Sequence, residues 1–219
     1  MPKVSETYKE ERRTHLVSAA ERVFLGQGYV RTTVQDILTE AGVSRGGLYL
    51  YFGNKAEIFE AVLERQDQHV LEQLRRVRQS PEPIGPALLE LANPGPVEPE
   101  ARRRVAMVVE YSLEHRDDPE RRAKLTDRLD RAEAALVDLL QEGVHRGEFH
   151  PRLPLRTIAL FLIQAQDGWS IHMAVWGESN RTGADYSAAM SVFMRHSLGM
   201  VDATREDEKS GKLTDEWRT

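Results

Sequence analysis

Apolar side chains recur every three or four residues along most of the chain, which is the spacing of one face of an α-helix. This pattern predicts helices at 9–26, 34–41, 45–52, 54–79, 86–92, 99–116, 119–146, 155–176 and 184–201. Glycine and proline clusters separate them, and six of the ten prolines lie between positions 80 and 100. No stretch alternates apolar and polar residues as a half-buried strand does. We therefore expect an all-α fold of about nine helices.

The stretch 33–55, TVQDILTEAGVSRGGLYLYFGNK, has the pattern of two short helices joined by a tight turn. Thr33 and Ser44 are good N-cap residues, each just before a segment of helical periodicity. Gly42 ends the first helix, because glycine adopts the left-handed backbone conformation without a Cβ penalty. A second stop signal, Gly-Asn, follows at 53–54. A helix-turn-helix of this kind can place its second helix in the major groove of DNA.

The second helix of this motif carries side chains suited to DNA. Arg45, near its N-terminus, can reach guanine O6 and N7 with two hydrogen bonds. Gly46 and Gly47 each cost about 1 kcal/mol against alanine inside a helix, and their bare backbone allows a close approach to DNA. Tyr49 and Tyr51 can give hydroxyl groups to phosphates. The alternative is an ordinary solvated helix with two core tyrosines.

The same stretch resembles the TetR (tetracycline-repressor) family of bacterial transcription regulators. The matching residues are Thr33, Val34, Asp36, Ile37, Ala41, Gly42, Val43, Ser44, Gly46, Leu48, Tyr49, Tyr51, Phe52, Asn54 and Lys55. The resemblance implies a three-helix DNA-binding head followed by a helical body that ends in two apolar helices. It also places Arg31 beside the duplex backbone.

The expected DNA contacts combine this resemblance with the chemistry of the motif. Lys55 begins the third helix, where backbone N–H groups already favour a phosphate. Leu50 departs from the family, in which a polar or aromatic residue is common, and can contact only a thymine methyl. The full set is Arg31, Thr33, Ser44, Arg45, Gly46, Gly47, Tyr49, Leu50, Tyr51 and Lys55.

The boundaries follow from the same pattern. We expect a DNA-binding head at 1–55 with its motif at 33–52, an effector-binding and dimerisation body at 56–201, and a charged, disordered tail at 202–219. Residues 1–8 are expected to form a disordered arm. The long helix that starts at 54 should connect the head to the body.

The helix expected at 155–176 is apolar around most of its circumference yet contains several polar residues, which need hydrogen-bond partners if they are buried. One interpretation is an effector pocket, and the other is burial in the core or in a subunit interface. The candidate pocket residues are Val108, Tyr111, His115, Leu136, Gln164, Asp167, Trp169, Met173 and Trp176. The candidate dimer residues are Ala165, Gly168, His172, Ala189, Phe193, His196 and Met200, since two terminal apolar helices suit a four-helix interface.

Composition adds limits. The net charge of −5 argues against a nucleic-acid binder, but residues 1–55 carry eight Lys/Arg against six Asp/Glu, so the head is basic. The absence of cysteine excludes disulfides and fits a reducing cytoplasm. No signal peptide is visible, and the longest strongly apolar run, 158–163, is far too short for a membrane span. We expect a soluble, cytoplasmic protein that has no membrane partner.

Enzyme signals are missing. The seven histidines show no paired metal-ligand spacing, and no nucleophile or phosphate-loop motif is present, so neither a metal nor a cofactor is expected. The leading hypothesis is a homodimeric repressor that binds a palindromic operator and is released by a small, largely hydrophobic molecule. The alternatives are a ligand-independent DNA-binding protein and a helical small-molecule enzyme.

Overall fold

The computed structural model describes residues 6–91, 99–177 and 182–200, and within these ranges every regular element is a helix. The helices are α1 (Glu6–Gln27), α2 (Val34–Ala41), α3 (Arg45–Tyr49), α4 (Lys55–Gln79), α5 (Ile84–Leu91), α6 (Pro99–Glu114), α7 (Pro119–His145), α8 (Leu155–Trp176) and α9 (Thr182–Leu198). The all-α expectation is confirmed. The tail at 202–219 and residues 1–5 of the expected arm lie outside the described residues.

Several helix boundaries differ from the expectation. α1 begins at Glu6, inside the expected arm. α3 ends at Tyr49, because the backbone N–H groups of Tyr51 and Phe52 both turn back to the carbonyl of Leu48. α5 begins at Ile84, two residues early, and α9 ends at Leu198.

Two residues explain the last two differences. The side chain of Glu148 accepts hydrogen bonds from the N–H groups of Ile84 and Gly85 at 2.6 and 3.1 Å, which satisfies the first turn of α5. Gly199 follows α9 with φ +57°, and a Cβ there would lie 2.2 Å from the carbonyl oxygen of His150. Neither contact has a local sequence signal, since both partners are distant in the chain.

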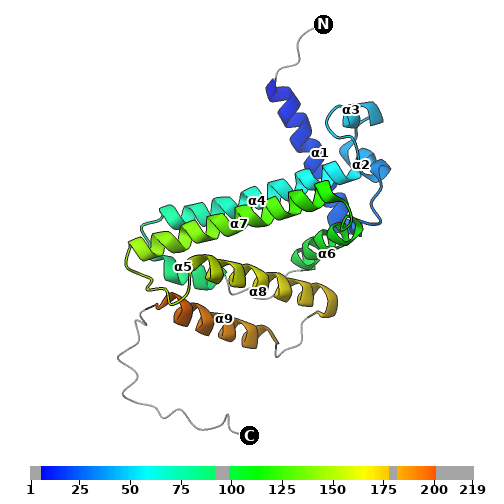
Figure 1. Ribbon diagram of the computed structural model, residues 1–219. Helices are drawn as coiled ribbons and strands as arrows, with labels where there is room; N and C mark the ends of the chain where they lie inside the picture. Colours follow the sequence, from blue (N-terminus) through cyan, green and yellow to red (C-terminus); the bar gives the residue numbers. More distant parts are fainter. Residues whose placement is uncertain (1–5, 92–98, 178–181, 201–219) are drawn as a thin grey trace, which may run out of the picture.

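The head forms around a hydrophobic core built mainly by α1, α2, α3 and the first turns of α4. Its fully buried side chains include Phe24, Ile37, Leu48 and Phe59. Met107 and Tyr111 of α6 belong to the same core, so a helix of the body completes the hydrophobic core of the head. Figure 1 shows α6 directly below the three-helix head.

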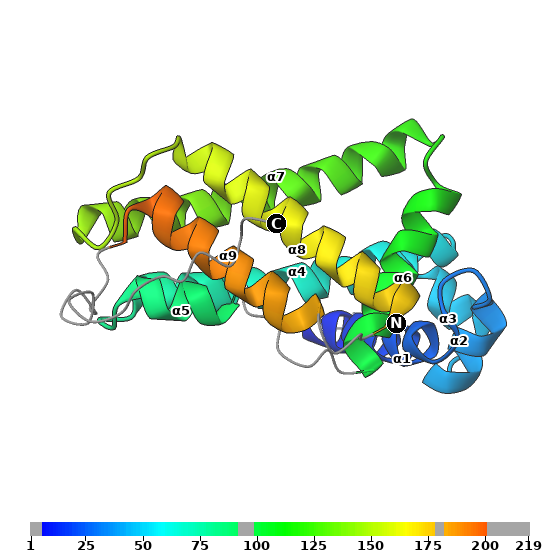
Figure 2. The same cartoon turned by 90° about the horizontal axis from the view of Figure 1, so that it is seen from below.

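The body is built in layers below α4 and α7, which run side by side (Figure 1). α8 packs against α6 and α7, and α9 packs on α8 as the outermost helix. Figure 2 gives the view from that side, with α9 across the face of the molecule. A second core of α5, α7, α8 and α9 is centred on Leu139, Leu140, Phe149, Ile158 and Met194. No helix among the described residues is both long and apolar enough to cross a membrane.

Candidate functional site

Capping residues that were expected from the sequence fix the ends of the two helices in the helix-turn-helix. The hydroxyl of Thr33 accepts from the N–H of Asp36 at 3.2 Å, and the carboxylate of Asp36 accepts in return from the N–H of Thr33 at 2.9 Å. The hydroxyl of Thr33 also lowers the pKa of Asp36, which keeps this cap charged. Gly42 ends α2 with φ +62°, and Ser44 caps α3 by accepting from the N–H of Gly47. These four assignments agree with the expected motif.

The caps leave α3 as an exposed helix held from below by one buried leucine, Leu48. Arg45, Gly46, Tyr49 and Leu50 are exposed, and Leu50 keeps 82% of its surface accessible. A Cβ added at Gly46 would meet nothing within 4 Å. The face of α3 is therefore open for a partner, as expected for a helix that enters a groove.

Three of the residues that were expected to contact DNA make contacts within the head. Tyr51 is half-buried against the core of the head, and the Nε of Arg31 donates to the carbonyl of Gln27. The ammonium of Lys55 donates to the carbonyl of Tyr29 at 3.0 Å and lies 4.2 Å from the centre of its ring. Lys55 thus holds the loop between α1 and α2, and its phosphate contact stays a prediction.

This loop is also bound to the body. The N–H of Val30 donates to the carboxylate of Glu110 at 3.0 Å, and the hydroxyl of Tyr29 shares a hydrogen bond of 2.9 Å with the imidazole of His115. Gly28 allows the close approach, because its φ is +83° and a Cβ there would lie 2.8 Å from Glu110. Glu110 is 80 positions away from Val30 in the chain, so its role appears only in three dimensions.

The ring of Tyr29 continues this junction inward. It packs edge-on to Tyr111 at 5.1 Å and tilted against Phe59 at 4.7 Å. The hydroxyl of Tyr111 donates to the carboxylate of Glu60 at 2.7 Å. A continuous set of contacts therefore leads from the loop before the helix-turn-helix to the side of α4 that faces α7.

Glu60 is the charged centre of that side. It also accepts from Lys124 at 3.0 Å and forms a close ion pair with Arg121. Burial alone raises the pKa of Glu60, but the hydrogen bonds from Tyr111 and Lys124 and the nearby charges outweigh it, so the pKa is lowered. Burial and the bond to Glu60 raise the pKa of Tyr111 to about 12, so it remains a hydrogen-bond donor.

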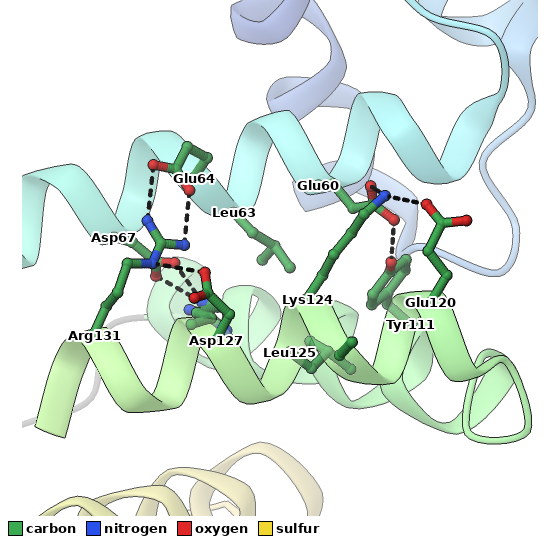
Figure 3. A pocket seen from close by; sticks show the side chains of 12 residues that line it. Glu60, Leu63, Glu64, Asp67, Tyr111, Glu120, Lys124, Leu125, Asp127 and Arg131 are labelled. Atoms are coloured by element: carbon green, nitrogen blue, oxygen red, sulfur yellow. Dashed lines mark hydrogen bonds and ion pairs between the residues drawn. The ribbon is translucent and has the colours of Figure 1, made fainter.

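A cavity of about 490 Å³ opens between α4 and α7 beside Glu60. Figure 3 shows its two ends, which are separate groups of ion pairs, with Leu63 and Leu125 between them. One end holds Glu60 and Lys124, and the other holds the pair of Glu64 with Arg131 at 2.9 Å. The lining residues are Glu60, Leu63, Glu64, Asp67, Tyr111, Glu120, Ala123, Lys124, Leu125, Asp127, Arg128 and Arg131.

The expected pocket residues do not gather around this cavity, and only Tyr111 lines it. Val108 and His115 pack at the junction with the head, and Leu136 is buried in the second core. Gln164 and Asp167 are exposed, and Trp176 keeps 71% of its surface accessible. Their assignment to an effector pocket therefore stays a prediction; the helix was expected to be apolar around most of its circumference, and one face of α8 is bare in the single chain.

Trp169 and Met173 are buried on the inner face of α8, away from the residues that line the cavity. The ring of Trp169 stacks on Tyr186 of α9 at 4.7 Å. Its indole N–H is buried and has no hydrogen-bond partner among the described residues. These two residues therefore join α8 to its neighbours in the fold.

The comparisons with known proteins agree with this architecture. Residues 16–62 match the family described as "Bacterial regulatory proteins, tetR family", and residues 99–182 match "Tetracyclin repressor-like, C-terminal domain". The HTH-type transcriptional regulator YfiR of Bacillus subtilis, itself described as uncharacterized, is 35% identical over 76% of this chain and 82% of its own. The HTH-type transcriptional repressor AcnR of Corynebacterium diphtheriae is 26% identical over 82% and 90%.

Solved structures share the fold. Salmonella enterica GusR superimposes with a TM-score of 0.69 at 19% identity, covering 90% of this chain and 98% of its own. A putative regulator from Saccharomonospora viridis, solved in complex with choline, gives 0.68 at 21% identity, covering 86% and 98%. The chain belongs to the TetR family of DNA-binding transcriptional regulators, which is a non-enzymatic class.

The charge network around Glu60 yields a test of stability. Because the pKa of Glu60 is lowered on folding, its carboxylate stabilises the fold above the unfolded-state pKa, and this contribution is lost as the pH falls through the folded-state value. Glu60→Gln keeps an acceptor for Tyr111 but removes the charge facing Arg121 and Lys124. We expect a loss of about 2 kcal/mol in the free energy of unfolding at pH 7, measured by urea denaturation.

The pH dependence of this loss in stability shows whether the charge of Glu60 causes it. The difference in the free energy of unfolding between wild type and Glu60→Gln should shrink as the pH falls below the ordinary pKa of glutamate and through the lower folded-state pKa of Glu60, where the wild-type carboxylate becomes protonated. Glu90→Gln is the control, since Glu90 is exposed on α5 and has no ion pair among the described residues. A gap for Glu60→Gln that stays constant as the pH is lowered through this range would refute the role of its charge.

Proposed function

We propose that this regulator is a repressor that binds a palindromic operator as a homodimer through α3 and is released by a small-molecule effector bound in the body. The observation that carries the proposal is the exposed, capped α3, whose Arg45 has no carboxylate partner among the described residues. A guanidinium held free at the N-terminal end of a bare helix suits bidentate recognition of a guanine edge.

Arg45→Ala tests base reading. Operators would be selected from a random duplex library, and affinities measured by fluorescence anisotropy for the selected site and for single-base changes in it. We expect the variant to lose about 1 to 3 kcal/mol on the selected site and to discriminate less at one base pair per half-site. Its affinity for unrelated DNA should change less.

Arg122→Ala provides the control, because Arg122 is an exposed arginine of α7 that has no ion pair in the described part of the chain. It should bind every duplex as wild type does. If Arg45→Ala and Arg122→Ala both keep the full base preference of wild type, Arg45 does not recognise a base in the way proposed.

The second part of the proposal concerns assembly. Phe161, Gly168, Ile171 and Val175 recur at spacings of seven, three and four along the exposed side of α8, and Val192 is exposed on α9. This apolar stripe, on the two outermost helices, is the kind of surface that a second copy covers in a four-helix interface. An isologous dimer across it would present two heads to a palindrome.

The stripe revises the expected dimer residues. Gly168, Ala189 and His196 are exposed and remain candidates. Ala165, Phe193 and Met200 pack against the second core, and His172 lies between the rings of Trp169 and Trp176. Gln164, first assigned to the pocket, lies on the exposed side of α8 and becomes a candidate interface residue. The revised set follows from which sides of α8 and α9 are buried in the body.

Val175→Asp should convert the protein to monomers, because it places a charge in the apolar stripe, while Val175 is already 63% exposed in the single chain. Size-exclusion chromatography with light scattering measures the mass, and circular dichroism checks the fold. Leu113→Asp is the control, since Leu113 is 58% exposed but lies on α6. A Val175→Asp protein that remains dimeric would contradict this interface.

The third part concerns the effector. The α4–α7 cavity supports a small molecule that packs its apolar part on Leu63 and Leu125 and engages the ion pairs at one end with a polar group. We therefore propose that the effector, expected to be largely hydrophobic, also carries a polar or charged group. The choline complex of the Saccharomonospora viridis regulator supports a small-molecule effector in proteins of this fold. We place the boundary between head and body at 55/56, in the first turn of α4.

Coupling follows from the contacts of Glu60. An effector in the cavity competes with Tyr111 and Lys124 for this carboxylate, and Tyr111 packs on the loop that precedes the helix-turn-helix. The effector then changes operator affinity only if it binds the two positions of the head with different free energies. A ligand-independent DNA-binding protein is the alternative, and it would show no such difference.

A further inference from the structure

The arginines of the head differ from those of the body in their partners. In the described part of α4 to α7, most arginines form an ion pair, as Arg65, Arg78 and Arg128 do with Glu21, Asp138 and Asp67. In the head, Arg22 pairs with Glu40. The other head arginines, Arg12, Arg13, Arg31 and Arg45, have no carboxylate partner among the described residues. The head therefore leaves its positive charge available.

Arg12 and Arg13 lie on α1, outside the helix-turn-helix, and aromatic rings fix the position of both. The guanidinium of Arg13 lies over the ring of Phe52, 5.5 Å from its centre. Arg12 lies over Tyr8 at the same distance, and its Nε donates to the Tyr8 hydroxyl at 3.1 Å. An arginine stacked in this way keeps its N–H groups free at the edge of the plane.

This part of α1 is close to α3. Phe52 follows directly on the turn that ends α3, so Arg13 lies beside the expected DNA-binding face. The pKa of Arg12 is raised mainly by Tyr8 and to a smaller extent by Tyr51, a residue of the same turn. Figure 1 shows the first turns of α1 rising next to α3, away from the body.

The position of these turns is firmly set. Two residues beyond Arg13, the imidazole of His15 shares a hydrogen bond of 2.9 Å with the carbonyl of Ala41, the last residue of α2. Leu16 and Val17 are buried in the core of the head. Glu10 and Glu11 are exposed nearby, but neither pairs with the two arginines, so the guanidinium groups remain available to an anion.

We propose that Arg12 and Arg13 bind phosphates of the operator backbone, so that α1 forms a second DNA contact beside α3. The partner is the sugar-phosphate backbone of double-stranded DNA, because two fixed and unpaired guanidinium groups suit phosphate oxygens and do not by themselves reach base edges. The proposal rests on the DNA-binding function of the family and is independent of the role given to Arg45.

The test is the salt dependence of binding. Each phosphate contact contributes about 0.9 to the slope of log K against log salt concentration. The double variant Arg12→Ala/Arg13→Ala should therefore reduce the slope by about 1.8 per subunit. Binding to the selected operator and to an unrelated duplex should weaken by similar factors, since backbone contacts carry no sequence information. Fluorescence anisotropy titrations between 50 and 300 mM KCl give both quantities.

Four further variants sharpen the result. Arg103→Ala, on the exposed side of α6, should leave the slope unchanged. Arg12→Lys/Arg13→Lys retains the charge and should keep most of the slope, while each single alanine variant should lose about half as much as the double variant. Thermal unfolding checks that each variant is folded, and the single variants serve if the double variant is not.

Any of three results would overturn the proposal. One is a wild-type slope in a folded alanine variant, and another is a loss confined to the selected operator. A lysine pair that loses as much slope as the alanine pair would also contradict it, because the charge would then not be the cause. The role of Arg45 is tested separately, because Arg45→Ala should change the base preference and leave the salt slope unchanged. Base recognition by Arg45 and phosphate binding by Arg12 and Arg13 can therefore be told apart.

Discussion

Helix α4 belongs to both hydrophobic cores, and this constrains the rest of the molecule. Its first turns bury Ile58, Phe59 and Val62 in the head, while Leu74 and Val77 near its other end pack against the core of the body. A helix cannot bend sharply between these points without breaking its hydrogen bonds. Glu60 and the cavity lie beside the turns of α4 that enter the head core, so a displacement of α4 at the cavity also displaces the head.

The junction at Tyr29 determines what such a displacement does. The loop before the helix-turn-helix is held by Lys55 of α4 and by Glu110 and His115 of α6. Both helices also supply a side chain to the cavity, Glu60 from α4 and Tyr111 from α6. Under the proposed function the same two helices contact the effector and position the recognition helix, so a change in their separation would alter both affinities together.

Local sequence signals were sufficient for the head and insufficient for the body. Caps and the left-handed Gly42 act within four residues, so Thr33, Ser44 and the ends of α2 could be read from the sequence. The cavity depends on pairs such as Glu64 with Arg131, which are far apart in the chain and have no local signature. The bare side of α8 had no local signal either, because Gln164 and Trp176 stand among apolar neighbours and the sequence left a pocket, the core and a subunit interface open for this helix.

Reciprocal coupling between the cavity and the operator is the central claim, and calorimetry tests it most directly. An effector identified by a thermal-shift screen would be titrated into the free protein and into its complex with the selected operator. The account predicts that the operator weakens effector binding by the same factor by which the effector weakens operator binding. Equal effector affinities in the two titrations would contradict the claim that this cavity controls DNA binding.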